Sequence, residues 1–189
     1  DVKLLKKLKI NYLYIPTSKD IYGFKPKNKI FLDKSSKKLC GKFRKGHFEG
    51  VLNVVNRFIE IIKPKYIYLG KKDYQQLFLI KKHIEKRKIK SRIIECETIR
   101  ENNGVACSSR NSKLNKNQIE VASNIHNYLR NLKKKIRKNY NLFKINKIRI
   151  DLINLGANKI DYVENYNIKS FKRILKSNKN FNLFFAYYI

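Results

Sequence analysis

The chain has 189 residues, of which 42% are hydrophobic and 12% aromatic, so it has enough apolar side chains to fold around a core. It carries 45 Lys and Arg against 14 Asp and Glu, a formal net charge of +31. No apolar run approaches the roughly 20 residues that a membrane-spanning helix needs, so the sequence predicts no membrane partner.

The excess of positive charge has two interpretations. So high a charge is typical of proteins that bind nucleic acid or an acidic membrane surface. The Lys residues are nevertheless spread along the whole chain, as compositional drift of an AT-rich gene would leave them, and not gathered on one face or helix. We therefore expect no specific nucleic-acid partner. The alternative is a basic nucleic-acid-binding domain, whose affinity for DNA or RNA would fall steeply with salt.

The cysteines, and the absence of methionine, indicate the redox compartment of the protein and whether the chain is a piece of a longer one. Cys40, Cys96 and Cys107 are far apart and odd in number, and they form no C-x-x-C motif. This pattern argues against a disulfide framework or a zinc site and fits the reducing cytoplasm. Met is absent, including at position 1, so we expect this chain to be a piece of a longer protein.

The first hundred residues alternate between helical and extended patterns. A helix at the start is followed by two expected strands, at residues 12–15 and 29–33. Apolar residues at the i, i+3, i+4, i+7 spacing predict a helix over residues 48–62. A strand, a helix and a strand follow, at residues 65–70, 72–87 and 91–96. This alternation is typical of an α/β fold with a parallel sheet, whose ligands bind beyond the carboxyl ends of the strands.

The second half of the chain has a different pattern. A long amphipathic helix is expected over residues 115–139, with Asn115 as its N-cap. A shorter helix over residues 145–156 and two strands, at residues 159–168 and 181–189, complete the chain. We therefore expect two domains: residues 1–98, carrying the parallel sheet, and residues 99–189, a smaller α+β domain.

Two clusters of polar residues stand at expected loops of the first domain. In "GKFRKGHFEGV" (residues 41–51), His47 lies between two glycines at the start of a helix, where free N–H groups suit an anion. In "GKKDYQQ" (residues 70–76), Lys72 offers a charge for phosphate, and Asp73 an acceptor for ribose hydroxyls. The two adjacent glutamines add donors and acceptors for a polar substrate. Taken alone, each cluster is equally well explained as a structural turn or helix start.

A third cluster, "NGVACSSRNSKL" (residues 103–114), precedes the long helix. Gly104 permits a tight turn, Ser108 and Ser109 supply hydroxyls, and Arg110 supplies a planar set of donors. Hydroxyls, backbone N–H groups and one Arg are suited to holding a polyphosphate. The loop could also be a plain turn, but three such clusters on connecting loops support one another.

The three clusters together resemble motifs of one enzyme family. "RKGHFEGV", "GKKDYQQL" and "NGVACSSRN" are similar to the motifs RPGHFxGV, GEKDxQQ and DGLAxSSRN of pantothenate synthetase (pantoate–β-alanine ligase), in the same order and at about the same spacing. The resemblance covers nearly the whole chain. It implies a Rossmann-like fold of the adenylate-forming nucleotidyltransferase type, followed by a smaller α+β C-terminal domain.

The resemblance also implies a reaction and a set of site residues. ATP, with Mg²⁺, activates pantoate as pantoyl adenylate, and β-alanine then displaces AMP to give pantothenate. Lys72 and Arg110 are expected to be catalytic, Gln76 to bind pantoate, and Arg44 and His47 to shape the site. The expected ATP-binding residues are Gly70, Lys71, Lys72, Asp73, Ile99, Cys107, Ser108, Ser109 and Arg110. The complete enzyme is expected to be a homodimer, and no metal site of the protein's own is expected.

The chain departs from the family pattern at several positions. Lys45 replaces the family proline, and Lys71 replaces the glutamate of GEKD. Glu49 stands where arginine is frequent, and Cys107 where Leu or Met is usual. The family's nucleotide-binding histidine motif and its first pantoate-binding glutamine are expected upstream of residue 1, and its last C-terminal segment is cut short. A second alternative is therefore an inactive remnant of the ligase fold.

Overall fold

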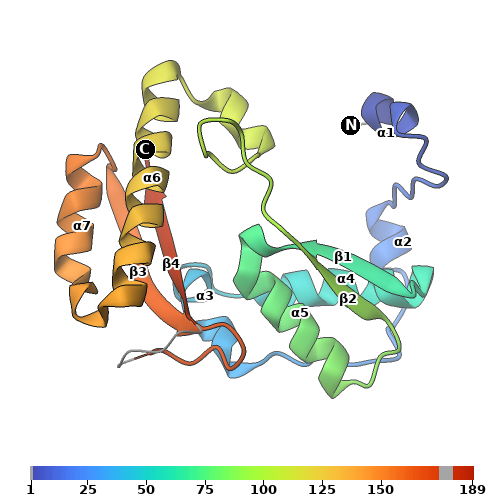
Figure 1. The fold of residues 1–189 in the computed structure, drawn as a ribbon. Coiled ribbons are helices and arrows are strands. Elements are labelled where there is room, and N and C mark those ends of the chain that lie inside the picture. Colours follow the sequence, from blue (N-terminus) through green and yellow to red (C-terminus); the bar gives the residue numbers. More distant parts are fainter. Residues whose placement is uncertain (1, 175–180) are drawn as a thin grey trace.

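The computed structural model describes residues 2–174 and 181–189 and contains two small sheets flanked by helices (Figure 1). The elements of the first part are α1 (Val2–Lys7), α2 (Ser18–Tyr22), η1 (Lys34–Lys37), α3 (Cys40–Phe43), α4 (His47–Ile62), β1 (Tyr66–Gly70), η2 (Lys71–Asp73), α5 (Tyr74–Lys86) and β2 (Arg92–Cys96). Those of the second part are η3 (Ser109–Lys113), α6 (Lys116–Lys138), η4 (Tyr140–Leu142), α7 (Ile145–Asn154), β3 (Lys159–Asn167) and β4 (Phe181–Tyr188).

Strands β1 and β2 form a parallel pair covered on one face by α4 and α5 (Figure 1). The register runs from Tyr66 opposite Arg92 to Gly70 opposite Cys96, so both strands end at the same edge. The apolar stripe of α4 meets that of α5 in a buried cluster that also receives side chains from both strands. This confirms the predicted helices and strands over residues 48–96 and the parallel α/β pattern.

The opposite face of this sheet is not covered by any described element. Tyr66, Tyr68 and Ile94 point outward there, and Tyr68 is 68% exposed. The alternation of exposed and half-buried positions along β1 follows from the two-residue period of a strand. In the part of the chain that the structure describes, this face of the sheet is apolar and exposed.

The second part is built on the long helix α6. Its N-terminus has a capping box, in which the side chain of Asn115 accepts from the N–H of Gln118 at 2.9 Å, and the side chain of Gln118 accepts from the N–H of Asn115 at 3.0 Å. Strands β3 and β4 pair antiparallel, and α6 and α7 pack against them (Figure 1). The predicted N-cap, helices and strands of this part are confirmed.

An aromatic cluster joins the two parts. Leu39 and Phe78, from the first part, pack against Tyr162, Tyr166 and Phe171, from the second. The rings of Phe78 and Phe171 stack with their centroids 4.7 Å apart. Burial of five large side chains makes this contact a continuous piece of core. We call these five residues the aromatic seam.

The two strands predicted near the N-terminus are wrong. Residues 12–15 belong to no strand or helix, and Tyr12 is 92% exposed. A strand needs a neighbour that pairs with its N–H and C=O groups, and no described residue offers one here. In residues 29–33 the backbone pairs with side chains and not with a neighbouring strand. The N–H of Phe31 donates to His83, and the C=O of Ile30 accepts from Arg87.

A buried histidine holds this irregular segment on the helices. His83 is fully buried on α5, its Nδ1 accepts from the N–H of Phe31 at 3.0 Å, and its Nε2 lies 3.0 Å from Oδ1 of Asn56. Asn56 in turn donates to the C=O of Asn28 at 2.7 Å. Because Nδ1 is an acceptor, Nε2 carries the proton and the ring is neutral. Burial, followed by the charge of Arg87, lowers the pKa of His83.

Among the described residues, no helix combines the length and the apolar character needed to cross a bilayer.

The neutral state of His83 predicts an acid-sensitive fold. A lowered pKa means that the unfolded chain binds the extra proton first, so the stabilising contribution is complete above pH ~6.5 and is lost as pH falls below it. We expect the difference in unfolding free energy between the wild type and His83→Gln to be large at pH 7.5 and smaller at pH 5.5, measured by urea denaturation. A difference that grows on acidification would contradict the neutral ring.

Candidate active site

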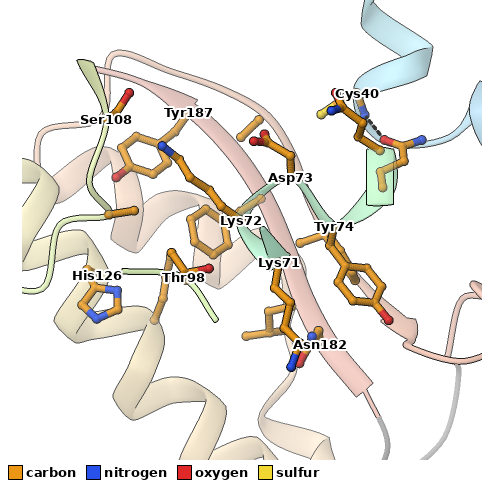
Figure 2. A pocket seen from close by; sticks show the side chains of 18 of the residues that line it. Cys40, Lys71, Lys72, Asp73, Tyr74, Thr98, Ser108, His126, Asn182 and Tyr187 are labelled. Carbon is orange, nitrogen blue, oxygen red and sulfur yellow. Dashed lines mark hydrogen bonds between the residues drawn. The ribbon is translucent and has the colours of Figure 1, made fainter. Parts of the chain in front are cut away.

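A cavity of about 930 Å³ lies where the two parts of the chain meet (Figure 2). Its walls come from α3 and the start of α4, from η2 and the first turn of α5, from residues 97–111, from α6 and from β4. The ends of β1 and β2 therefore open into it, as expected for a ligand site of a parallel sheet. Of the predicted site residues, those in its wall are Arg44, His47, Lys71, Lys72, Asp73, Gln76, Ser108 and Arg110.

Four other predicted site residues lie beside the cavity and not in its wall. Gly70 ends β1, directly before the lysines. Ile99 has a side chain that is 72% exposed. Cys107 and Ser109 are exposed in the loop before α6.

Lys72 brings the second and third motifs together. Its ammonium donates to the C=O of Cys107 at 3.0 Å, across a separation of 35 residues in the chain. Figure 2 shows the side chain reaching from η2 toward the loop that carries Ser108. The cation expected to bind phosphate is thus already held against the loop expected to bind the same phosphate.

The third motif forms a short hairpin followed by a 3₁₀ turn. The N–H of Cys107 donates to the C=O of Ile99 at 3.0 Å, and Arg100 and Ala106 form a bridge. We call residues 99–107 the nucleotide hairpin, after the role that the family resemblance predicts for them. Ser108 then caps η3, because its Oγ accepts from the N–H of Arg110 at 3.2 Å.

Asn111 is a structural residue that the sequence analysis missed. Its side-chain amide donates to the C=O of Ala106 at 3.1 Å and to the carboxylate of Glu101 at 2.9 Å. It therefore fastens η3 to both strands of the nucleotide hairpin. The signal was present, since Asn111 is the last letter of the SSRN motif, but only its contacts reveal the role.

The two neighbouring glutamines have different roles. Gln75 is buried, accepts from the N–H of Cys40 at 3.1 Å and donates to the C=O groups of Ser35 and Lys38 at 2.9 and 2.7 Å. Both N–H groups of this amide are therefore used by the backbone around α3, so the expectation that Gln75 would donate to a substrate is wrong. Gln75 and Gln76 both line the cavity, but none of the hydrogen bonds found among the described residues involves the side chain of Gln76.

His47 and Arg44 stand together at the start of α4. Gly46 has a φ of +73°, which favours glycine, and this turn brings His47 to the first helical position. Burial lowers the pKa of His47, the charge of Arg44 lowers it further, and Asp73 opposes both. The imidazole is therefore neutral near pH 7 and can both donate and accept a hydrogen bond.

Lys71 forms an ion pair with Glu97, a residue the sequence analysis did not select. The pair is explained by the sheet register, because Lys71 and Glu97 directly follow the paired residues Gly70 and Cys96. The hydrogen bond that the ammonium of Lys71 donates to the carboxylate of Glu97 raises the pKa of Lys71. The extra charge that replaces the family glutamate is thus balanced by a carboxylate one strand away.

Helix α6 supplies a wall with further basic side chains that the motifs did not indicate. His126, Arg130 and Lys133 line the cavity at helical spacing. Lys133 is half-buried and donates to Oδ1 of Asn182 on β4 at 2.8 Å. Among the described residues, no group of three or more His, Cys, Asp or Glu side chains is arranged to hold a metal ion.

The family model described as pantoate-beta-alanine ligase matches residues 1–189. The chain belongs to the pantoate–β-alanine ligase family. The pantothenate synthetase of Fervidobacterium nodosum is 34% identical over 180 residues, which are 93% of this chain and 63% of that protein. The pantothenate synthetase of Francisella tularensis subsp. novicida is 40% identical over 136 residues, 69% of this chain and 50% of that protein.

A solved structure of the family confirms the fold class. The crystal structure of pantoate–β-alanine ligase from Francisella tularensis, complexed with β-γ ATP and β-alanine, has a TM-score of 0.71 and 29% sequence identity to this chain. The match covers 99% of this chain and 68% of that one. The chain thus has the nucleotidyltransferase-type fold of the family, and it spans between half and about two thirds of the length of these relatives.

The contacts of Gln75 predict that replacing Gln75 lowers the stability of the fold much more than replacing Gln76. Gln75→Leu leaves one N–H and two C=O groups around α3 without their partner, so we expect it to lower the free energy of unfolding by about 3 kcal/mol. Gln76→Leu, the matched control, should change it by less than ~0.5 kcal/mol. Urea denaturation of both variants measures the contrast, and equal effects would contradict the assignment.

Proposed function

We propose that the chain is part of an enzyme that condenses pantoate with β-alanine at the expense of ATP. Membership of the pantoate–β-alanine ligase family supports this activity, as does the Francisella tularensis relative that was solved with β-γ ATP and β-alanine. The observation that carries the proposal is the contact of Lys72 with Cys107, which brings the GKKD and SSRN motifs to one wall of a 930 Å³ cavity.

The proposed reaction has two steps. A carboxylate oxygen of pantoate attacks the α-phosphorus of ATP. The bond between this phosphorus and the oxygen that bridges to the β-phosphate breaks, giving pantoyl adenylate and pyrophosphate. The amine of β-alanine then attacks the acyl carbon, AMP leaves with the bonding pair, and the amine loses a proton. No residue of the protein becomes covalently attached, so the rate must come from alignment of the reactants and stabilisation of developing charge.

The cations of the cavity suit the nucleotide. We assign Lys72 and Arg110 to the phosphates, because they approach the cavity from the two motifs that meet there. Asp73 is assigned to the ribose, and Ile99 to the adenine through its backbone. The remaining proposed nucleotide contacts are Gly70, Lys71, Cys107, Ser108 and Ser109. The pairing of Lys71 with Glu97 makes it a weaker partner for phosphate than Lys72.

Pantoate is assigned to the side of the cavity formed by α5 and α4. Gln76 lines this wall, and its amide can both donate and accept, as the hydroxyls of pantoate require. Arg44 and His47 lie in the same wall and shape it. The neutral imidazole of His47 adds no charge beside the attacking carboxylate.

The residues present fit a Mg²⁺ ion that enters with ATP. Mg²⁺ keeps several of its waters and binds through substrate phosphates with at most one or two carboxylates, and Asp73 is a carboxylate in the cavity wall. When bound, Mg²⁺ neutralises charge that develops on the pyrophosphate.

The proposal extends to the organisation of the enzyme. We assign residues 1–98 to the domain of the parallel sheet and residues 99–189 to a smaller domain that carries the nucleotide hairpin. The family resemblance further implies a homodimer in the cytoplasm for the complete enzyme.

Replacement of Lys72 tests the nucleotide assignment. In the complete gene product that contains these residues, Lys72→Ala should lower the rate of pantoyl adenylate formation about 100-fold, since a charged contact to the reacting phosphates is lost. Lys82→Ala, whose lysine pairs with Glu85 on the exposed face of α5, is the matched control. AMP release that depends on all three substrates gives the rate. A loss of less than about threefold for Lys72→Ala would refute the assignment.

Replacement of Gln76 separates the two substrates. Gln76→Ala should weaken pantoate about tenfold or more, because a buried hydroxyl loses its partner, and should leave ATP within about twofold. Calorimetric titration of the same gene product with each substrate measures both affinities. Equal weakening of pantoate and ATP would contradict the role of Gln76.

A further inference from the structure

The turn of the nucleotide hairpin rests on α6 through two contacts. Oγ of Ser123 donates to the C=O of Asn103 at 2.7 Å. The ring of His126, one turn further along α6, fills the space beside Gly104, so that a Cβ added at Gly104 would lie 2.5 Å from Cδ2 of the ring. The first contact fixes where the turn attaches, and the second fixes how closely it approaches the helix.

Contacts within the turn couple its position to that of the rest of the nucleotide hairpin. Gly104 has a φ of +86°, a conformation that side chains rarely adopt. Its C=O accepts from Nη1 of Arg100 at 3.0 Å, and the N–H of Val105 donates to the side chain of Asn103 at 3.0 Å. The strands of the hairpin are paired up to Cys107, whose C=O meets Lys72. A displacement at the turn therefore moves the whole hairpin.

We propose that His126 is a positioning residue for the nucleotide hairpin. Its ring packs against Gly104 and sets the distance between residues 99–107 and α6 at which the hairpin binds ATP; we call this packed ring the wedge. His126 also lines the cavity, so the wedge stands at the edge of the site itself (Figure 2). The proposal rests on the proposed function, because it takes the hairpin to be the ATP-binding loop.

The charges around the ring make the wedge sensitive to protonation. The charged groups that face it are Arg100 from the hairpin and Arg130 from α6, and both, after burial, lower the pKa of His126. Glu101, the carboxylate of the hairpin, is bonded to an asparagine amide. Tyr187 of β4, in the same cavity, has a pKa raised by burial and stays neutral. A protonated His126 would be a third cation between two arginines, pushing the hairpin away.

Hydrogen exchange tests the wedge without any ligand. In the 189-residue chain, His126→Ala should speed exchange of the Cys107 amide about tenfold, because the hairpin loses its contact with α6 at Gly104 and opens more often. His126→Phe keeps a flat ring against Gly104 and should leave the rate within about twofold. Asn127→Ala, an exposed neighbour on the same turn of α6, is the matched control. Equal rates in all three variants would overturn the proposal.

Kinetics of the complete gene product test the effect on the substrate. His126→Ala should raise the KM for ATP about tenfold, leave the KM for pantoate within about twofold, and be rescued by His126→Phe. A loss shared by both substrates would show a general structural role and overturn the proposal. If the wild type has no ligase activity, the proposed function fails, while the exchange rates still decide whether the wedge exists.

A pH profile separates the charge of the ring from its shape. The KM for ATP should rise below pH ~6.5 more steeply in the wild type than in His126→Phe, since only the wild type acquires the third cation. The titration of ATP itself is common to both proteins and cancels in the comparison. Identical profiles would show that protonation of His126 does not move the hairpin.

Discussion

The aromatic seam is the contact on which the site depends. Its stack of Phe78 on Phe171 joins the helix after the GKKD motif to the segment after β3, and no other described contact between the two parts buries as many large rings. Polar bonds run beside it, from the Tyr74 hydroxyl to the C=O of Ile168 at 2.8 Å and from Lys38 to the C=O of Phe171 at 3.2 Å. The cavity lies beside the seam, and Tyr162 belongs to both.

The seam and the site share their elements, which explains why the binding groups are well placed. The first turn of α5 places Tyr74, Gln75 and Gln76 in the cavity wall. Tyr74 also bonds to the second part of the chain, and Gln75 to the backbone around α3. Rotation of this turn would disturb all three at once. A site built on such a turn is more rigid than one built on a free loop, and alignment of reactants benefits from that rigidity.

Local signals in the sequence predicted most of the fold and only part of the site. The stripe of α4, the N-cap at Asn115 and the strand that ends at Gly70 are each encoded within a few residues, so they were predicted correctly. The segment at residues 29–33 was predicted as a strand, because its pairing with His83 across 52 positions leaves no local trace. The ion pair of Lys71 with Glu97 likewise depends on the register of two strands. The order of the motifs indicated which loops lie together in the fold, but not which side chains make the contacts between those loops.

The outward sheet face of Tyr66, Tyr68 and Ile94 gives the chain a behaviour in solution that depends on ionic strength. Two molecules that bring these faces together gain hydrophobic contact, but each carries a formal charge of +31. At low salt the repulsion extends far beyond the contact distance and keeps the molecules apart. At about 1 M salt the screening length shrinks to roughly 3 Å, and the same apolar face becomes adhesive. We therefore expect the 189-residue chain to self-associate more strongly as the salt concentration rises.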